Sequence, residues 1–348
     1  MGERYIVGLD IGTTKVCVTV GQLRRGYDPI VVGMGLVPSA GGEKGVVTDM
    51  GAAAECIRNA IEEAERSSGI NIRAAYVGVA GTHVECHESR GAAGIRGGYI
   101  SDDDVDRVME SASSICVPID PTILNGLPID YIVDGQSGIA DPVGMSGARL
   151  ETRVWVITAS LAALENLARC CEMAGVYVID TVFEPLASSR SVLKESELRS
   201  SVAVIDIGGG TTDVAVFRNH TLAHASVLPV GGWHFSNDLS IGLRVSHEEA
   251  ERVKREYGYA AGKAEGPAEI EIADGEGDRH MVPRTLLWEI IFPRAEEIFE
   301  LAGADLKGAN LSGAELEMAN LSGAKLDQVK FDEETVLPDG SKWVEGVD

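Results

Sequence analysis

The sequence predicts an α/β protein built from two similar halves, each interrupted by an insertion, with a short right-handed, four-sided β-helix at the C-terminal end. A strand–turn–strand segment that occurs twice, at 5–20 and again at 202–217, predicts the two halves. Leucine at every fifth position beyond residue 300 predicts the β-helix.

The first half should alternate strands and helices on both sides of its insertion. A helix over 50–68 carries Ile57, Ile61 and Ala64 at the spacing of one packed face, and Gly69 ends it. The other elements expected in this half are a strand over 30–38, a strand over 74–80, a helix over 160–174 and a strand over 176–183 that leads to Glu184.

Both insertions contain a helix whose start is visible in the sequence. The insertions are expected at 81–158 and 231–294. In the first, Ser101 and Asp104 form a capping-box pattern ahead of an apolar stripe, and in the second Ser246 and Glu249 do the same. Strand-like segments flank the first of these helices near 84–93, 127–134 and 149–158.

The C-terminal segment repeats every five residues. A period of five advances an α-helix by about 140° per repeat, so these leucines could not share one helical face. They resemble the pentapeptide-repeat family instead, in which Leu points into a right-handed β-helix, so we expect repeats over 301–331 and a closing tail over 332–348. The repeated positions are Leu301, Leu306, Leu311, Leu316, Leu321 and Leu326, followed by Phe331.

Composition narrows the classes of function. The 348 residues carry a net charge of −24, which disfavours binding to nucleic acid or to anionic lipid. The six cysteines are scattered without CxxC spacing, which indicates reduced thiols in a cytoplasmic protein rather than a disulfide framework or a zinc site. The sequence has no 18-residue apolar run and no signal-peptide pattern at its start.

The turns of the duplicated segment have the composition of phosphate-binding loops. Glycine lets backbone N–H groups approach an anion, threonine hydroxyls add donors, and an aspartate at the strand end can hold Mg²⁺ through water. We interpret the second turn as two residues longer than the first. A ligand-free glycine turn is the alternative, and the second copy makes it less favoured. The candidate phosphate-binding residues are Gly12, Thr13, Thr14, Lys15, Gly208, Gly209, Gly210, Thr211, Thr212 and Asp213, with Asp10 and Asp206 as candidate Mg²⁺ ligands.

The paired loops resemble those of the actin/Hsp70/sugar-kinase superfamily, and the sequence between them resembles the bacterial cell-division family FtsA. The most discriminating stretch is 138–151, since sugar kinases and Hsp70 have nothing like it. Further similar stretches are Gly78–His83, Ser101–Val108, Tyr131–Gln136, Phe183–Ser188, Leu228–Gly232, Asn237–Leu243 and Ala250–Gly258. The resemblance runs from about residue 4 to about 300, short of the segments that grip adenosine and bind the membrane in FtsA.

This resemblance implies an actin-like, ribonuclease H-like fold with an SHS2-type first insertion and an incomplete second half. It implies binding of ATP and Mg²⁺, at most a weak ATPase activity, and a place at the inner face of the membrane reached only through partners. Those partners would be the C-terminal tail of FtsZ, on 231–294, and other FtsA-like copies, through 81–158. The implied domains are 1–80 with 159–190, then 81–158, then 191–230 with 295–300, then 231–294.

Glu184 and the pair Gly231 and Gly232 carry further expectations. The resemblance gives Glu184 the role of orienting the attacking water, although a carboxylate at a helix start explains it equally well. It adds Gly231 and Gly232 to the nucleotide site, but Trp233 follows where the family usually has Asp, and an indole accepts no hydrogen bond.

Two functions stay open at this point. The first is an FtsA-like, nucleotide-dependent scaffold that binds FtsZ in the division ring. The second is an FtsA-derived interaction module that has lost nucleotide binding and has no membrane anchor of its own. His83 and His87 could suggest zinc, but histidines on a strand surface are the more favoured interpretation.

Overall fold

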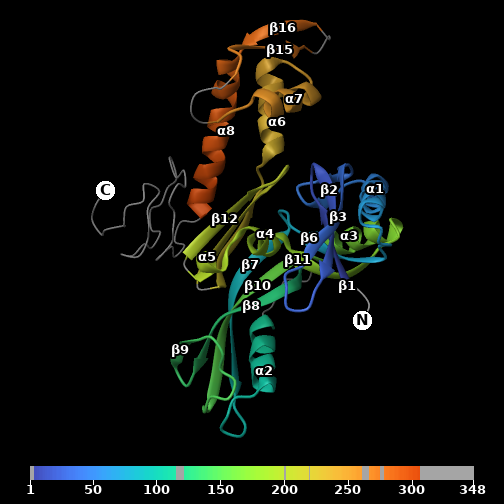
Figure 1. The fold of residues 1–348 in the computed structure, drawn as a ribbon. Coiled ribbons are helices and arrows are strands. Elements are labelled where there is room, and N and C mark those ends of the chain that lie inside the picture. The colour runs from blue at the N-terminus through green and yellow to red at the C-terminus, as the bar shows by residue number, and fades with distance from the viewer. Residues whose placement is uncertain are drawn as a thin grey trace, which may run out of the picture.

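The computed structural model has a central body with the first insertion on one side of it and the second insertion on the other (Figure 1). The structure describes residues 4–114, 121–199, 201–218, 220–260, 266–274 and 278–305. The expected pentapeptide repeats beyond residue 305 and the tail over 332–348 therefore lie outside the described residues. None of the helices in the described ranges is long and apolar enough to cross a membrane.

The first half of the body is a five-stranded sheet in the order β11-β6-β1-β2-β3. The first three strands in the chain pair antiparallel, and β6 and β11 extend the sheet in parallel with β1. This mixed arrangement confirms the strands predicted from the hairpin and from the segments near 74–80 and 176–183. The strands are β1 (Arg4–Ile11), β2 (Lys15–Leu23), β3 (Ile30–Pro38), β6 (Ala74–Val79) and β11 (Tyr177–Phe183).

Two helices, α1 (Met50–Ser68) and α3 (Leu161–Met173), contact each other and pack on the sheet. Gly35 on β3 lets α1 approach closely, since a Cβ there would lie 1.9 Å from the carbonyl oxygen of Ala60. Gly69 ends α1 in the left-handed region with φ of 72°, as predicted. The short elements of this half are β4 (Gly42–Glu43), β5 (Val46–Val47), α4 (Glu184–Val192) and α5 (Glu195–Arg199).

The first insertion is a four-stranded sheet in the order β7-β10-β8-β9 with one helix, α2 (Asp102–Ser113), against it. The Asp104 carboxylate accepts hydrogen bonds from the backbone N–H and the hydroxyl of Ser101, which fixes the predicted helix start. The structure differs from the prediction in the extra strand β9 and in the earlier start of β8. The strands are β7 (Val84–Gly94), β8 (Pro121–Val133), β9 (Gln136–Ile139) and β10 (Arg149–Ser160).

The second half contributes three antiparallel strands, β12 (Ser201–Ile207), β13 (Thr212–Arg218) and β14 (Thr221–Leu228). The apolar run of β13 is buried on both faces, since Val214, Ala215 and Val216 are fully buried. Helix α4 of the first half contacts both β12 and β13, so the two halves are joined next to the duplicated turns.

The second insertion has its own apolar core, which α6 (Gly232–Leu243) and α7 (His247–Tyr257) form with three later elements. Ser246 accepts the N–H of Glu249 as predicted, but the Glu249 carboxylate pairs with Arg252 instead of completing the box. The later elements are β15 (Glu269–Ala273), β16 (Arg279–Pro283) and α8 (Arg284–Asp305).

Helix α8 corrects one predicted boundary. It runs without a break through residue 300, so residues 301–305 form its last turn instead of the first pentapeptide repeat. Ile298 and Ala302 are buried and α8 contacts β14, which stabilises the helix beyond the point where the leucine period begins. An ion pair between Arg294 Nε and Asp238 Oδ2, at 2.7 Å, also joins α8 to α6.

Candidate functional site

The two duplicated turns are equal in length, which corrects our interpretation of the sequence. Ile11 pairs with Val16, and Ile207 pairs with Thr212, so each hairpin encloses four residues. In the first turn the N–H of residue 12 donates to the carbonyl of residue 15 at 3.0 Å, and in the second residue 208 donates to residue 211 at 2.9 Å. The same cross-strand register therefore builds both turns.

The two loops touch each other where the halves of the body meet. A Cβ on Gly209 would lie 2.5 Å from Thr14 Cγ2, and a Cβ on Gly210 would lie 2.7 Å from Thr13 Oγ1. Gly231 packs beneath the second loop, since a Cβ there would lie 2.6 Å from the carbonyl oxygen of residue 208. These glycines are required because a side chain at any of them would push the loops apart.

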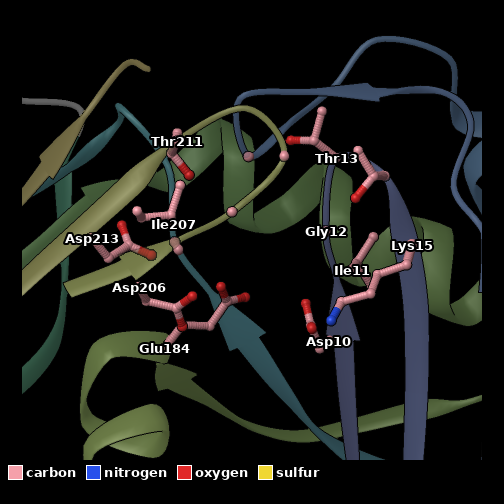
Figure 2. A pocket seen from close by; sticks show the side chains of 15 residues that line it. Asp10, Ile11, Gly12, Thr13, Lys15, Glu184, Asp206, Ile207, Thr211 and Asp213 are labelled. Carbon is pink, nitrogen blue, oxygen red and sulfur yellow. The ribbon is translucent and has the colours of Figure 1, made fainter. Parts of the chain in front are cut away.

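Beside the loops lies a cavity of about 290 Å³, which we call the inner cavity (Figure 2). Both halves of the body contribute to its wall, at the ends of β1 and β12 and in the turns that follow them. The residues around it are Asp10, Ile11, Gly12, Thr13, Thr14, Lys15, Gly45, Ala80, Glu184, Asp206, Ile207, Gly208, Gly209, Thr211 and Asp213.

Four carboxylates and one amine face this cavity (Figure 2). Burial raises the pKa of Glu184 to about 8, and the charges of Asp10, Asp213 and Asp206 add to the rise. Burial likewise raises the pKa of Asp213 to about 7, with Asp206 adding to it. Burial also raises the pKa of Asp10, which Lys15 opposes. The site thus holds protons near neutral pH that a bound cation would displace.

Glu184 is placed by the end of β11 and by a glycine on the neighbouring strand. It is the first residue of α4, which fits the plain interpretation of a carboxylate at a helix start. Its carboxylate also points into the inner cavity with the three aspartates (Figure 2). Gly78 on β6 makes the room, because a Cβ there would lie 2.8 Å from Glu184 Oε1.

The inner cavity fits a hydrated divalent cation. Asp213 Oδ1 is buried and has no hydrogen-bond partner, and Asp213 pairs across the hairpin with Asp206. In the described parts of the chain no three carboxylate, imidazole or thiol side chains converge to hold an ion by themselves, His83 and His87 included. Water or phosphate oxygens would have to complete the coordination of Mg²⁺, as predicted for a water-mediated site.

Four residues of the predicted nucleotide site do not line the inner cavity. Thr212 is fully buried, and its hydroxyl donates to the carbonyl of Val230 at 2.8 Å, so it supports the loop from below. Gly210 and Gly231 provide the close approaches described above instead of facing the cavity. Gly232 also lies elsewhere, in a second cavity.

That second, outer cavity has a volume of about 710 Å³ and shares Thr13, Thr14, Lys15, Ile207, Gly208 and Gly209 with the inner one. Helices α6 and α7 supply Trp233, His247, Glu251, Lys254 and Arg255 to its wall. Sequence reasoning missed this set. The signal that could have found it is the spacing 247, 251, 254 and 255, which places four polar side chains on one face of a helix.

Sequence comparison identifies the family. The profile of "Cell division protein FtsA" matches residues 203–330, and that of "SHS2 domain inserted in FTSA" matches residues 81–158. Cell division protein FtsA of Pseudomonas aeruginosa is 39% identical over 306 residues, which are 87% of this chain and 73% of that protein. FtsA of Neisseria meningitidis serogroup B is 40% identical over 88% of this chain and 74% of that protein. The chain belongs to the FtsA family.

The actin-like fold expected of an FtsA relative is supported by solved structures. The PilM-PilN type IV pilus biogenesis complex contains a chain that superposes with a TM-score of 0.62 at 16% identity, covering 94% of this chain and 88% of that one. MreB5 of Spiroplasma citri bound to ADP gives a TM-score of 0.51 at 16% identity, covering 87% and 78%. The SHS2 match coincides with the first insertion, and the FtsA match takes in both the second loop and most of the leucine repeats.

Proposed function

We propose that this FtsA-like cell-division protein is a scaffold switched by ATP and Mg²⁺. The observation that carries the proposal is the meeting of two identically built loops over a cavity with four carboxylates and one lysine. Glycine-rich turns with free backbone N–H groups suit phosphate, and strand-end aspartates suit a hydrated cation. Mg²⁺, when bound, would neutralise charge on the phosphates and on the carboxylates together.

The residues of the site would have separate roles in binding phosphate, holding the cation and orienting water. The turns at 12–15 and 208–211 would hold phosphate oxygens from opposite sides, and Lys15 would add a positive charge beside Asp10. Asp10 and Asp206 would hold the waters of the cation. Glu184 would orient a water toward the terminal phosphate. Because its pKa is raised to about 8, the side chain is largely protonated at pH 7 and would accept a proton only when a cation lies nearby. A slow ATPase that serves as a switch is the activity that follows.

The outer cavity supports a place for the adenosine of the nucleotide. It opens from the same loops, it is large enough for a nucleoside, and it combines charged groups on α7 with apolar walls. A nucleotide whose phosphates occupy the inner cavity would extend into it. This continuity favours the nucleotide-dependent scaffold over an interaction module that has lost nucleotide binding.

Titration of the purified chain with fluorescently labelled ATP, with and without Mg²⁺, tests the proposal. We expect saturable, Mg²⁺-dependent binding that Asp206→Ala abolishes, because Asp206 is one of the two strand-end aspartates proposed to hold the waters of the cation. Asp28→Ala, which removes an exposed aspartate outside both cavities, is the matched control and should bind normally. Absence of binding by the unmodified chain would favour the interaction module instead.

We also infer two protein partners from family membership. The region 231–294 would bind the C-terminal tail of FtsZ, and 81–158 would contact a neighbouring FtsA-like copy, which together would bring the chain to the division site. Each region has an apolar core of its own, which supports its use as a separate docking unit. Fluorescence anisotropy with a labelled peptide of the FtsZ tail tests the first, and sedimentation of the chain with and without ATP tests the second.

A further inference from the structure

Trp233 is a large aromatic side chain left half-exposed at the wall of the outer cavity. It is 44% exposed, in the first turn of α6. The His247 ring lies nearly parallel to it, with ring centroids 5.6 Å apart and an interplanar angle of 31°. The His234 ring meets it edge-on, at 5.5 Å and 87°. The indole thus has two aromatic neighbours while its side chain still lines open space.

The backbone holds this indole in a fixed place next to the second loop. The N–H of Trp233 donates to the carbonyl of Gly209 at 2.7 Å, and the N–H of Gly232 donates to the carbonyl of Gly208 at 2.8 Å. The first turn of α6 is therefore attached directly to the loop proposed to hold phosphate. The indole therefore lies close to any phosphate bound by that loop.

A polar network fixes α6 against α7 behind the same wall. Lys254 Nζ donates to the carbonyl of Gly232 at 3.1 Å and to Ser236 Oγ at 2.9 Å, and it pairs with Glu251 at 2.6 Å. This network keeps Trp233 and His247 side by side, because each belongs to one of the two helices that it joins. The aromatic wall is preorganised rather than assembled by a ligand.

The outer cavity also has an aliphatic lining. Leu36, Val37 and Pro38 line it from the end of β3, and Arg255 adds a positive charge. A planar ring with polar edges matches this combination of aliphatic, aromatic and charged groups. A ligand made of ribose and phosphate alone would have no flat ring to stack on the indole.

We propose that Trp233, backed by His247, is the stacking surface for the purine base of the nucleotide bound by the two loops. This inference rests on the proposed function, and it adds the group that recognises the base. Stacking of a base on an aromatic side chain contributes enough to change affinity by about tenfold or more. Such stacking uses the π-face that every base has, so Trp233 would add affinity for the base without choosing between adenine and guanine.

Two ligands separate base recognition from phosphate binding. The affinities of ATP and of inorganic tripolyphosphate, both with Mg²⁺, are measured by calorimetry for the unmodified chain and for its variants. We expect Trp233→Ala to weaken ATP binding about tenfold and to leave tripolyphosphate binding unchanged. Trp288→Ala removes an indole that is 37% exposed and stacked on Phe292 of α8, outside both cavities, so it should change neither affinity.

A conservative variant guards against misfolding. Trp233→Phe keeps an aromatic face, so it should bind ATP within about threefold of the unmodified chain, while the quenching of tryptophan emission by ATP should disappear. Equal ATP affinity in Trp233→Ala, or ATP-induced quenching that persists in Trp233→Phe, would overturn the inference and leave nucleotide binding intact. If the unmodified chain binds neither ATP nor tripolyphosphate, the proposed function fails and this inference fails with it.

Discussion

Replacing Glu184 by glutamine should stabilise the protein when no ligand is bound. Burial and three neighbouring aspartates raise the pKa of Glu184 from 4.5 to about 8. Between these two values the folded state binds a proton that the unfolded state has lost, so folding costs more as the pH rises. At about 1.4 kcal/mol per pH unit, the carboxylate should cost up to about 3 kcal/mol at pH 7. Glutamine keeps the size of the side chain and removes this cost.

Thermal melting of both proteins at pH 5, 6, 7 and 8, in buffer without nucleotide or divalent cations, measures the effect. The difference in melting temperature should be smallest at pH 5, grow with each step and amount to several degrees at pH 7. Glu55→Gln, at an exposed position of α1, is the matched control and should change the melting temperature little at any pH. A Glu184→Gln advantage that stays constant from pH 5 to pH 8 would refute the reasoning, since it would not come from titration.

Three further changes test the packing and the site. Gly35→Ala should cost about 3 kcal/mol or more because its Cβ would lie 1.9 Å from a carbonyl oxygen of α1, whereas Gly8→Ala on the same sheet meets nothing within 4 Å and should be nearly neutral in urea unfolding. Gly231→Ala should lower the melting temperature and weaken ATP binding, because its Cβ would lie 2.6 Å from a loop carbonyl, and normal binding would contradict this. Asp213→Asn should raise stability by an amount that grows from about pH 4 to pH 7, because the pKa of this carboxyl is raised from 3.8 to about 7. It should also weaken Mg²⁺-dependent ATP binding, and unchanged affinity would remove Asp213 from the site.

Local patterns in the sequence were sufficient for most elements of the fold. The apolar spacing of Ile57, Ile61 and Ala64, together with Gly69, predicted α1 within a residue of its observed bounds. The repeated hairpin predicted two halves with facing loops, and Asp10 and Asp206 indeed lie together around one cavity. These features follow from residues close to one another in the chain, where periodicity, capping and turn preferences act directly.

Two features were decided by pairing and packing that the sequence patterns did not reveal. The sequence suggested turns of different length, but cross-strand pairing of Ile207 with Thr212 set the second turn to four residues. The leucine period predicted pentapeptide repeats from residue 301, but burial of Ala302 kept α8 helical through residue 305. The second case depends on distant segments, because α8 contacts β14.

The chemistry of the site likewise depends in part on residue types and in part on how the chain packs. Residue types alone marked Glu184 and the aspartates as candidates, but only their burial in one small cavity gives Glu184 a pKa of about 8. The outer cavity combines the end of β3 with α6 and α7, and the Lys254 network joins these two helices so that Trp233 and His247 lie side by side. Desolvation and the distances between charges are properties of the packed chain, because they exist only after segments nearly 200 residues apart have been brought together.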